Sequence, residues 1–328
     1  MTLDLRAIRR QLRAVLPTVQ LTGDDSLSLE RSDLPVEPPH TRACEMLEGA
    51  TLEAVPVEGV PTVGFAAFLD GIQTSRVWHY DDGIPIIFGH AAAAVRQRID
   101  RRLTLWGEPR ESGRFYVPLE LLSAPAREAI EQVGVPIENT LPTDDRHGEM
   151  PHPLQLLRHA IHAVQRDRES LERDCAESWC EREQAPLFVD GGLPRGERAS
   201  VAPWCVGVVK SHHTLYANGD ALRVISSLGE GERTRVFRID PTWGPAVASW
   251  YLRVRRGSGR DPLWGLVRVE VALDSAQGDL AALYERATCV SRWILAERTP
   301  LALPDGRWDR MAYGIRDCES FLRARLSS

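Results

Sequence analysis

Two short apolar runs, each ending in Asp-Gly, constrain this chain more than any other feature. The first ends in Phe68-Leu69-Asp70-Gly71 and the second in Phe188-Val189-Asp190-Gly191. A run without polar alternation is typical of a strand buried on both faces in the middle of a sheet. Asp-Gly is also a common turn signal, so one run alone indicates only a turn. Because the pattern is repeated around a long helical candidate, we expect two parallel strands whose carboxylates, Asp70 and Asp190, converge at one edge of a sheet.

The elements around these runs predict an α/β fold. Strands are expected at 62–69, 75–80 and 84–88, joined into an antiparallel meander by short connections at 71–74 and 81–83. An apolar stripe with flanking charges predicts a long helix over 153–183. A right-handed crossover through this helix makes the strand that ends at Asp190 parallel to the meander. The predicted core is a mixed sheet flanked by helices.

The chain divides into an arm and one large domain. Residues 1–60 are expected to form an N-terminal helix, at 3–15, and an irregular arm rich in Asp, Ser, Glu and Pro. Residues 61–328 form the main domain, with an insertion near 107–150. Its second half is expected to be a β-rich and helical extension, with strands at 204–209, 234–239, 249–255 and 265–273, a weak helix at 219–228 and helices at 278–297 and 310–326.

Composition excludes several classes of protein. A hydrophobic content of 43% with 26% charged residues is ordinary for a soluble globular chain. No apolar run approaches the roughly 18 residues of a membrane span, and the N-terminus lacks a signal-peptide core, so we expect a cytoplasmic protein without a membrane partner. The six cysteines include no C-x-x-C pair, which favours reduced thiols over disulfides or a zinc site. A net charge of -6 does not indicate nucleic-acid binding, although a local patch can provide it.

The predicted skeleton resembles the ribonuclease-H-like nucleases. Three short motifs resemble the NurA family of DNA-end-processing nucleases more narrowly: Phe68-Leu69-Asp70-Gly71-Ile72-Gln73, Leu187-Phe188-Val189-Asp190-Gly191-Gly192-Leu193 and Val206-Gly207-Val208-Val209-Lys210-Ser211. The resemblance implies a nuclease that needs Mn²⁺ or Mg²⁺ and trims DNA ends. It also implies a homodimer bound to a hexameric HerA-type ATPase that translocates DNA, with a role in repair or in defence against foreign DNA.

The resemblance assigns the metal site to carboxylates. The family's two strand-end aspartates correspond to Asp70 and Asp190. A third carboxylate is expected on the helix before the second aspartate, where Glu169 and Glu172 both qualify, one turn apart on one face; Glu172 is preferred. Oxygen ligands of this kind suit Mg²⁺ and Mn²⁺, which support hydrolysis of a phosphodiester by activating water and offsetting negative charge.

At two positions the sequence departs from the family or is unusual. The family usually completes its site with a histidine on a C-terminal helix, but this chain has no histidine after His213, so Asp317 is expected to replace it as an oxygen ligand. Lys210 is the only lysine of the chain and follows a predicted strand. It is expected either to contact the scissile phosphate or to be an ordinary surface lysine.

Arginines are concentrated between 221 and 270. Alternate spacing places pairs of them on one face of a strand, which indicates a track for DNA phosphates or, alternatively, a solvated sheet face. The residues expected to bind DNA are Lys210, Arg233, Arg235, Arg253, Arg255 and Arg256.

Two other functions remain open from the sequence. The missing histidine is compatible with a catalytically weakened NurA-like dimer that acts as an adaptor for DNA and the ATPase ring. An Argonaute-like or transposase-like enzyme on the related fold is disfavoured, because no guide-binding or DNA-recognition domain is visible at this length.

Overall fold

The structure is a computed structural model that describes residues 38–100, 102–141, 151–242, 244–255, 261–273, 280–298 and 313–326. It is an α/β structure in which five described helices flank a mixed sheet of parallel and antiparallel strands, so the predicted fold class is confirmed at this level. The helix expected at 3–15 and Arg256 lie outside the described residues. None of the described helices is long and apolar enough to cross a membrane.

The chain separates into two compact units. Unit 1 contains Gly71–Ala93 and Arg110–Leu171, and unit 2 contains Glu37–Asp70, Ala94–Pro109 and Glu172–Ser328. The boundaries fall inside four long elements, namely β4 (Ala67–Asp81), β5 (Ile84–Ile99), β6 (Arg102–Val117) and α3 (Pro153–Arg182).

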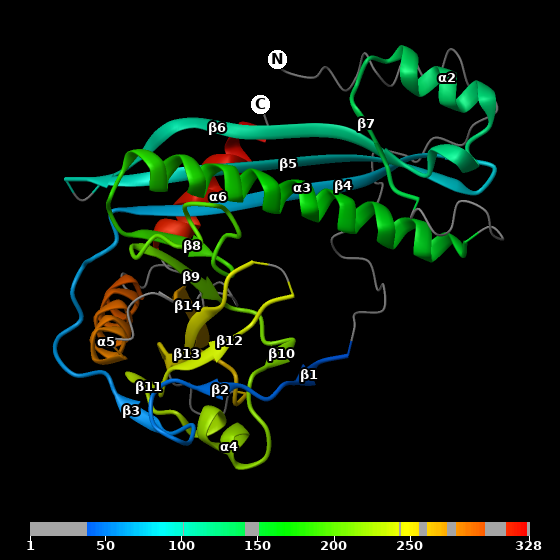
Figure 1. Cartoon of the computed structure of the whole chain (residues 1–328). Helices are drawn as coiled ribbons and strands as arrows, with labels where there is room; N and C mark the ends of the chain where they lie inside the picture. Colours follow the sequence, from blue (N-terminus) through cyan, green and yellow to red (C-terminus); the bar gives the residue numbers. More distant parts are fainter. Residues whose placement is uncertain are drawn as a thin grey trace. The chain divides into compact units, whose positions relative to one another are not determined.

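In unit 1 two helices cover the β4–β5–β6 strands (Figure 1). The helix α2 (Ala124–Gln132) begins after Ser123, whose hydroxyl accepts a hydrogen bond from the backbone of Ala126. Its apolar residues pack with Trp78, Phe88 and Phe115, whose rings meet edge to face. The first half of α3 packs through small residues such as Ala160 and Ala163 against a separate cluster that includes Tyr116. The edge strand of this unit is β7 (Ile137–Asn139), parallel to β6.

In unit 2 the strands follow the order β2-β12-β13-β14-β9-β8-β4-β5-β6, with β11 paired to β13 and β3 paired to β11. Two parallel pairs, β4 with β8 and β8 with β9, lie at its centre, and the strands from β9 to β2 pair antiparallel. The bounds are β2 (Glu45–Met46), β3 (Ala54–Pro56), β8 (Leu187–Asp190), β9 (Cys205–Val209), β11 (Glu232–Thr234), β12 (Phe237–Ile239), β13 (Val247–Arg253) and β14 (Leu266–Ala272). A separate parallel pair joins β1 (His40–Thr41) to β10 (Thr214–Leu215).

The core of unit 2 lies between this sheet and two C-terminal helices, α5 (Leu280–Glu297) and α6 (Tyr313–Leu326). The sheet contributes buried side chains to this core, among them Phe68, Phe188 and Trp250. The indole of Trp250 donates to Ser291 of α5, at 3.0 Å, which ties the two layers together. A short amphipathic helix, α4 (Asp220–Ser227), packs at the edge near β11 and β13 (Figure 1).

The three-strand meander is present, but its strands differ from those expected. The connection predicted at 71–74 is wrong, because β4 continues through it without a turn. The turn falls at Asp82 and Gly83, whose φ angles of 46° and 84° suit a two-residue hairpin. The third strand is β6, which begins before the region expected to be an insertion and ends inside it. Its burial pattern mixes exposed and half-buried residues, so it lacks the apolar periodicity that predicts a strand.

Part of the predicted arm belongs to the sheet. Residues 38–60 carry β1, β2 and β3, which pair with β10, β12 and β11. These strands are only two or three residues long. Their position depends on backbone pairing with distant strands, which a local pattern does not reveal.

Candidate active site

The parallel register of β4 and β8 brings Asp70 and Asp190 to the same place. Phe68 pairs with Phe188 and Leu69 with Val189, so the next pair along both strands consists of the two aspartates. Alternate residues of a strand share a face, which places both carboxylates on the face that carries the buried phenylalanine rings. Two acidic groups far apart in the sequence therefore become neighbours in unit 2.

Lys210 lies beside this pair. Asp190 is paired with Val208 on β9, and Lys210 follows two residues later on the same face. Its ammonium donates a hydrogen bond to Oδ2 of Asp190. The two side chains are 20% and 16% exposed, so this ion pair is largely shielded from water.

The loop after β8 fixes the position of Asp190. It folds back over β9 at Gly207, where a Cβ atom would lie 2.5 Å from the backbone nitrogen of Leu193. That nitrogen donates to Oε2 of Glu270 at 2.9 Å, and Glu270 also binds Arg268 at 2.7 Å. Only glycine permits this crossing, so the conformation of the chain beyond Asp190 depends on Gly207.

The helix α6 approaches the same strands from the core side. A Cβ atom on Gly314 would lie 2.1 Å from the ring of Phe68, which shows how closely the helix meets β4. One turn further, the thiol of Cys318 donates to the carbonyl of Phe68 at 3.3 Å. Burial, followed by the charge of Asp70, raises the pKa of Cys318 well above its usual value. The next residue, Glu319, is thus carried to the neighbourhood of Asp70.

Asp70 experiences an acidic environment. It is 4% exposed, and its pKa is raised well above the usual value, first by burial and then by the charge of Asp190. Lys210 lowers this pKa, whereas Glu172 and Glu319 raise it further. We call Asp70, Glu172, Asp190 and Glu319 the acidic cluster. Among the groups that act on Asp70, three are carboxylates and one is the ammonium of Lys210.

The two candidates on α3 have different environments. Glu172 is 8% exposed and acts on the charge of Asp70. The side chain of Glu169 is 52% exposed and interacts with Gln165 and Arg168 on its own helix. The structure therefore brings Glu172, the preferred candidate, to the cluster and leaves Glu169 on the surface.

On α6 the structure brings Glu319, and not the expected Asp317, near Asp70. Asp317 forms an ion pair with Arg96 of β5 at 2.5 Å, and Arg96 also donates to the carbonyl of Leu103. Glu319 is the group that acts on Asp70. The sequence contains a signal for this choice, since Ile315, Cys318 and Leu322 form the buried stripe of the helix, to which Glu319 is adjacent and Asp317 is opposite.

Two arginines of the expected track are buried. Arg233 and Arg253 are 2% and 3% exposed. Arg233 binds Glu48 at 2.7 Å, and Arg253 donates to carbonyl oxygens such as those of Leu228 and Pro262. A buried guanidinium needs such partners, so these two residues hold loops together instead of facing a phosphate.

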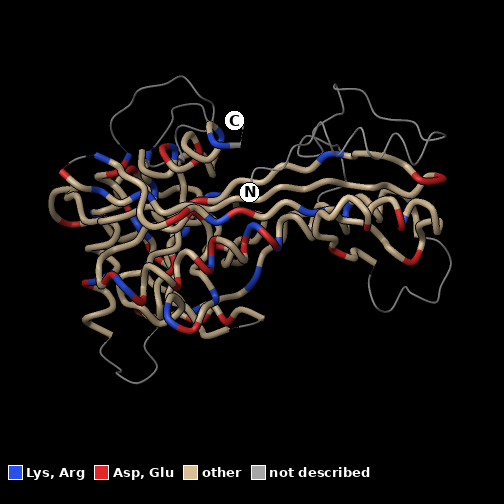
Figure 2. The backbone as a smooth tube through the Cα atoms, turned by 90° about the horizontal axis from the view of Figure 1, so that it is seen from above, with Lys and Arg blue, Asp and Glu red and all other residues tan. Residues whose placement is uncertain are grey.

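Two further arginines also have partners within the chain. Arg235 pairs with Glu53 at 2.9 Å, and Arg255 donates to the carbonyl of Arg298. Acidic and basic residues are interspersed along the described backbone (Figure 2). Arg233 and Arg253 lie in strands as expected, whereas Arg235 and Arg255 fall outside them. Spacing also could not distinguish arginines that face solvent from arginines that anchor the fold.

The donor set of the acidic cluster fits a hard divalent cation. All four groups are carboxylates, the oxygen ligands that Mg²⁺ and Mn²⁺ prefer, and the buried Asp70 carboxyl lies in surroundings that disfavour its charged form. The side chains are not gathered into a ready-made cage, since within the described ranges no three His, Cys, Asp or Glu side chains meet the spacing of a metal site.

No protein-family model matches this sequence, and no curated protein matches it either.

Proposed function

We propose that this chain is a divalent-metal-dependent DNA nuclease with a ribonuclease-H-like fold, similar to the NurA nucleases. One observation supports the proposal above all others: the parallel register of β4 and β8 places Asp70 beside Asp190, and two helix-borne carboxylates, Glu172 and Glu319, lie near enough to raise the pKa of Asp70. Hydrolysis of a phosphodiester needs carboxylates held in this way, because they orient cations that stabilise charge on the phosphate.

Each group has a proposed role in this reaction. Asp70, Asp190 and Glu172 would hold a Mg²⁺ or Mn²⁺ ion, with Glu319 in the place expected for Asp317. A bound ion would lower the pKa of a water molecule and offset the charge of the scissile phosphate. Lys210, which donates a hydrogen bond to Asp190, would bind the phosphate as a point charge.

The proposed partners follow from the same resemblance. DNA is the substrate, and a hexameric HerA-type ATPase would supply translocation to a homodimer of this chain. Repair of DNA ends and defence against foreign DNA are both compatible with this chemistry.

The test is a cleavage assay with linear single- and double-stranded DNA and Mn²⁺. We expect cleavage by the wild-type chain and its loss, by at least about 10²-fold, in Asp70→Asn and Asp190→Asn. Asp261→Asn, in an exposed turn, is the matched control and should retain activity. Equal cleavage by the wild type and both site variants would reject the proposal, since the activity would then come from a contaminant or another site.

The Lys210–Asp190 ion pair favours a second candidate, a catalytically weakened adaptor. If the ammonium permanently occupies Asp190, the chain would bind DNA and an ATPase ring without cleaving. Capture of a purified HerA-type hexamer, together with no cleavage in Mn²⁺ or Mg²⁺, would support this candidate over the nuclease.

A further inference from the structure

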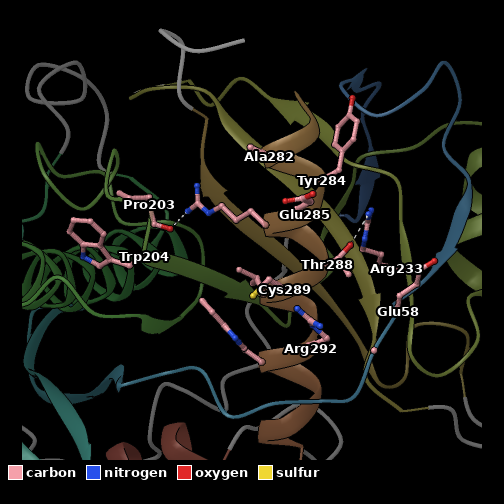
Figure 3. Close-up of a pocket in the computed structure, with 14 residues that line it drawn as sticks. Glu58, Pro203, Trp204, Arg233, Ala282, Tyr284, Glu285, Thr288, Cys289 and Arg292 are labelled. Carbon is pink, nitrogen blue, oxygen red and sulfur yellow. Dashed lines mark hydrogen bonds between the residues drawn. The ribbon is translucent and has the colours of Figure 1, made fainter. Parts of the chain in front are cut away.

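A cavity in unit 2 lies away from the acidic cluster. Its volume is about 980 Å³, and α5 forms its floor. Glu58 and Gly59 line one side, and Pro203 and Trp204 line the other (Figure 3). This volume lies within the usual range of sites for small molecules, roughly 300–1,000 Å³. We call it the α5 groove.

Two arginines give the floor of the groove a positive charge. Arg286 donates to the backbone carbonyls of Pro203 and Ala272, and the first of these bonds is drawn as a dashed line in Figure 3. Burial lowers the pKa of Arg286 to about 10, so its charge is incompletely solvated. Among the described residues, Nε of Arg292 has no hydrogen-bond partner. An anion bound in the groove would give the guanidinium groups a charged acceptor, which binds them more strongly than backbone carbonyl oxygens do.

The other charges around the groove are already matched or are exposed. Arg233, at its end, binds Glu48 and Thr288. Glu58 and Glu285 also line the groove, but both are exposed to solvent, which screens their charge. The positive charge therefore lies deep and the negative charge lies at the rim.

Aromatic side chains and a thiol complete the lining. Tyr284 and Trp293 of α5 are among the lining residues, and Cys289 lies between them along the helix. The indole of Trp204 points away from α5 (Figure 3). Trp293 is held in place by Phe65, whose ring lies 5.6 Å away edge to face. Rings of this kind favour a flat apolar partner.

The groove and the acidic cluster lie at opposite ends of β9. Trp204 precedes the first residue of the strand, and Lys210 follows the last. Five residues of extended strand span about 17 Å, so a small ligand in the groove would not reach the carboxylates. The groove is thus a separate site.

We propose that the α5 groove binds a small aromatic anion of mononucleotide size, with its anionic head at Arg286 and Arg292 and its ring against Trp293. Arginine suits a phosphate or carboxylate head because its fork matches two oxygens at once. This inference does not depend on the nuclease proposal.

The test uses adenosine 5′-monophosphate as the probe and the full chain in EDTA, so that no metal-dependent site contributes. Isothermal titration calorimetry should show binding by the wild type, with at least about tenfold weaker binding by Arg292→Gln. Glu285→Gln should bind more tightly, because it removes a repulsive charge from the rim. Adenosine and inorganic phosphate, tested separately, should each bind at least about tenfold more weakly than the nucleotide.

Thiol labelling locates the binding. Cys44 and Cys289 are half-buried and the other four cysteines are buried, so a Cys44→Ser background limits maleimide labelling to Cys289. The nucleotide should slow this labelling. Arg223→Gln, on the exposed side of α4, is the control arginine and should bind like the wild type.

Three results would overturn the proposal. They are unchanged affinity in both Arg292→Gln and Glu285→Gln, binding without protection of Cys289, and inorganic phosphate that binds as tightly as the nucleotide. If Arg292→Gln fails to fold, as judged by circular dichroism, Glu285→Gln and the labelling experiment still decide the outcome.

Discussion

The ammonium of Lys210 donates a hydrogen bond to Oδ2 of Asp190, and Lys210 lies two residues beyond Val208, the β9 residue that pairs with Asp190. The only lysine of the chain thus supplies a positive charge inside a group of four carboxylates. A cation that binds the acidic cluster must compete with this ammonium or share Asp190 with it. The proposed binding of metal should therefore change the stability that this ion pair contributes.

A double-mutant cycle measures this ion pair. Lys210→Met, Asp190→Asn and the combined variant should show a coupling of about 1–3 kcal/mol in the free energy of unfolding, because both groups are largely buried. In urea denaturation, Mn²⁺ should stabilise Lys210→Met more than the wild type, since the ion takes the place of the ammonium. A coupling of zero would show that the contact contributes nothing.

The pH dependence of stability should reveal Asp70. Its pKa in the folded chain is raised well above the unfolded value near 3.8, so between these two values the folded state holds more protons than the unfolded state. The free energy of unfolding in EDTA should therefore decrease as pH rises from about 4 through the folded pKa. Asp70→Asn should remove this part of the slope in urea denaturation from pH 4 to 8. An identical slope in the variant would contradict the assigned environment of Asp70.

The two glutamates of α3 should respond differently to the same substitution. Glu172→Gln should lower DNA cleavage by about 10²-fold or more, because it removes a charge beside Asp70. Glu169→Gln should alter cleavage by less than about fivefold, since its exposed contacts contribute little. Rates with Mn²⁺ under single-turnover conditions provide the comparison. A larger loss of cleavage in Glu169→Gln than in Glu172→Gln would place the site on the other side of α3.

A similar pair on α6 separates a site role from a structural one. Glu319→Gln should weaken Mn²⁺ binding, measured by calorimetry, and should reduce the pH slope attributed to Asp70. Asp317→Asn should cost about 1–2 kcal/mol of stability through its bond with Arg96 but leave both quantities unchanged. Loss of Mn²⁺ binding in Asp317→Asn alone would restore Asp317 as the ligand.

Gly314→Ala tests whether the docking of α6 positions the site. The added methyl group would overlap the ring of Phe68, so we expect a loss of about 1–3 kcal/mol in the free energy of unfolding and a smaller pH effect from Asp70. Ser320→Ala, on the exposed side of the same helix, should be close to neutral. Thermal denaturation of the two variants gives the answer, and equal midpoints would argue against close packing.

Local pattern predicted some elements well and others poorly. The long helix expected at 153–183 is present as Pro153–Arg182, since one apolar stripe defines it. The strand β6 was missed because it is neither alternating nor continuously apolar, and pairing with β5 maintains it. The turn predicted at 71–74 is wrong because the same dipeptide, Asp-Gly, occurs in two conformations. It forms a turn at Asp82-Gly83 and is part of an extended strand at Asp70-Gly71.

The sequence alone determined the coarse α/β class and the placement of Asp70 and Asp190 at the ends of neighbouring parallel strands, because both depend on short-range order: apolar runs, their lengths and the residue that ends each run. Tertiary structure alone decided which further groups join them. Glu172 over Glu169, Glu319 over Asp317, and the burial of Arg233 and Arg253 depend on how helices and strands distant in the chain pack together. Burial and the charge of a spatial neighbour set the chemistry of a side chain, and neither is encoded in the residues beside it.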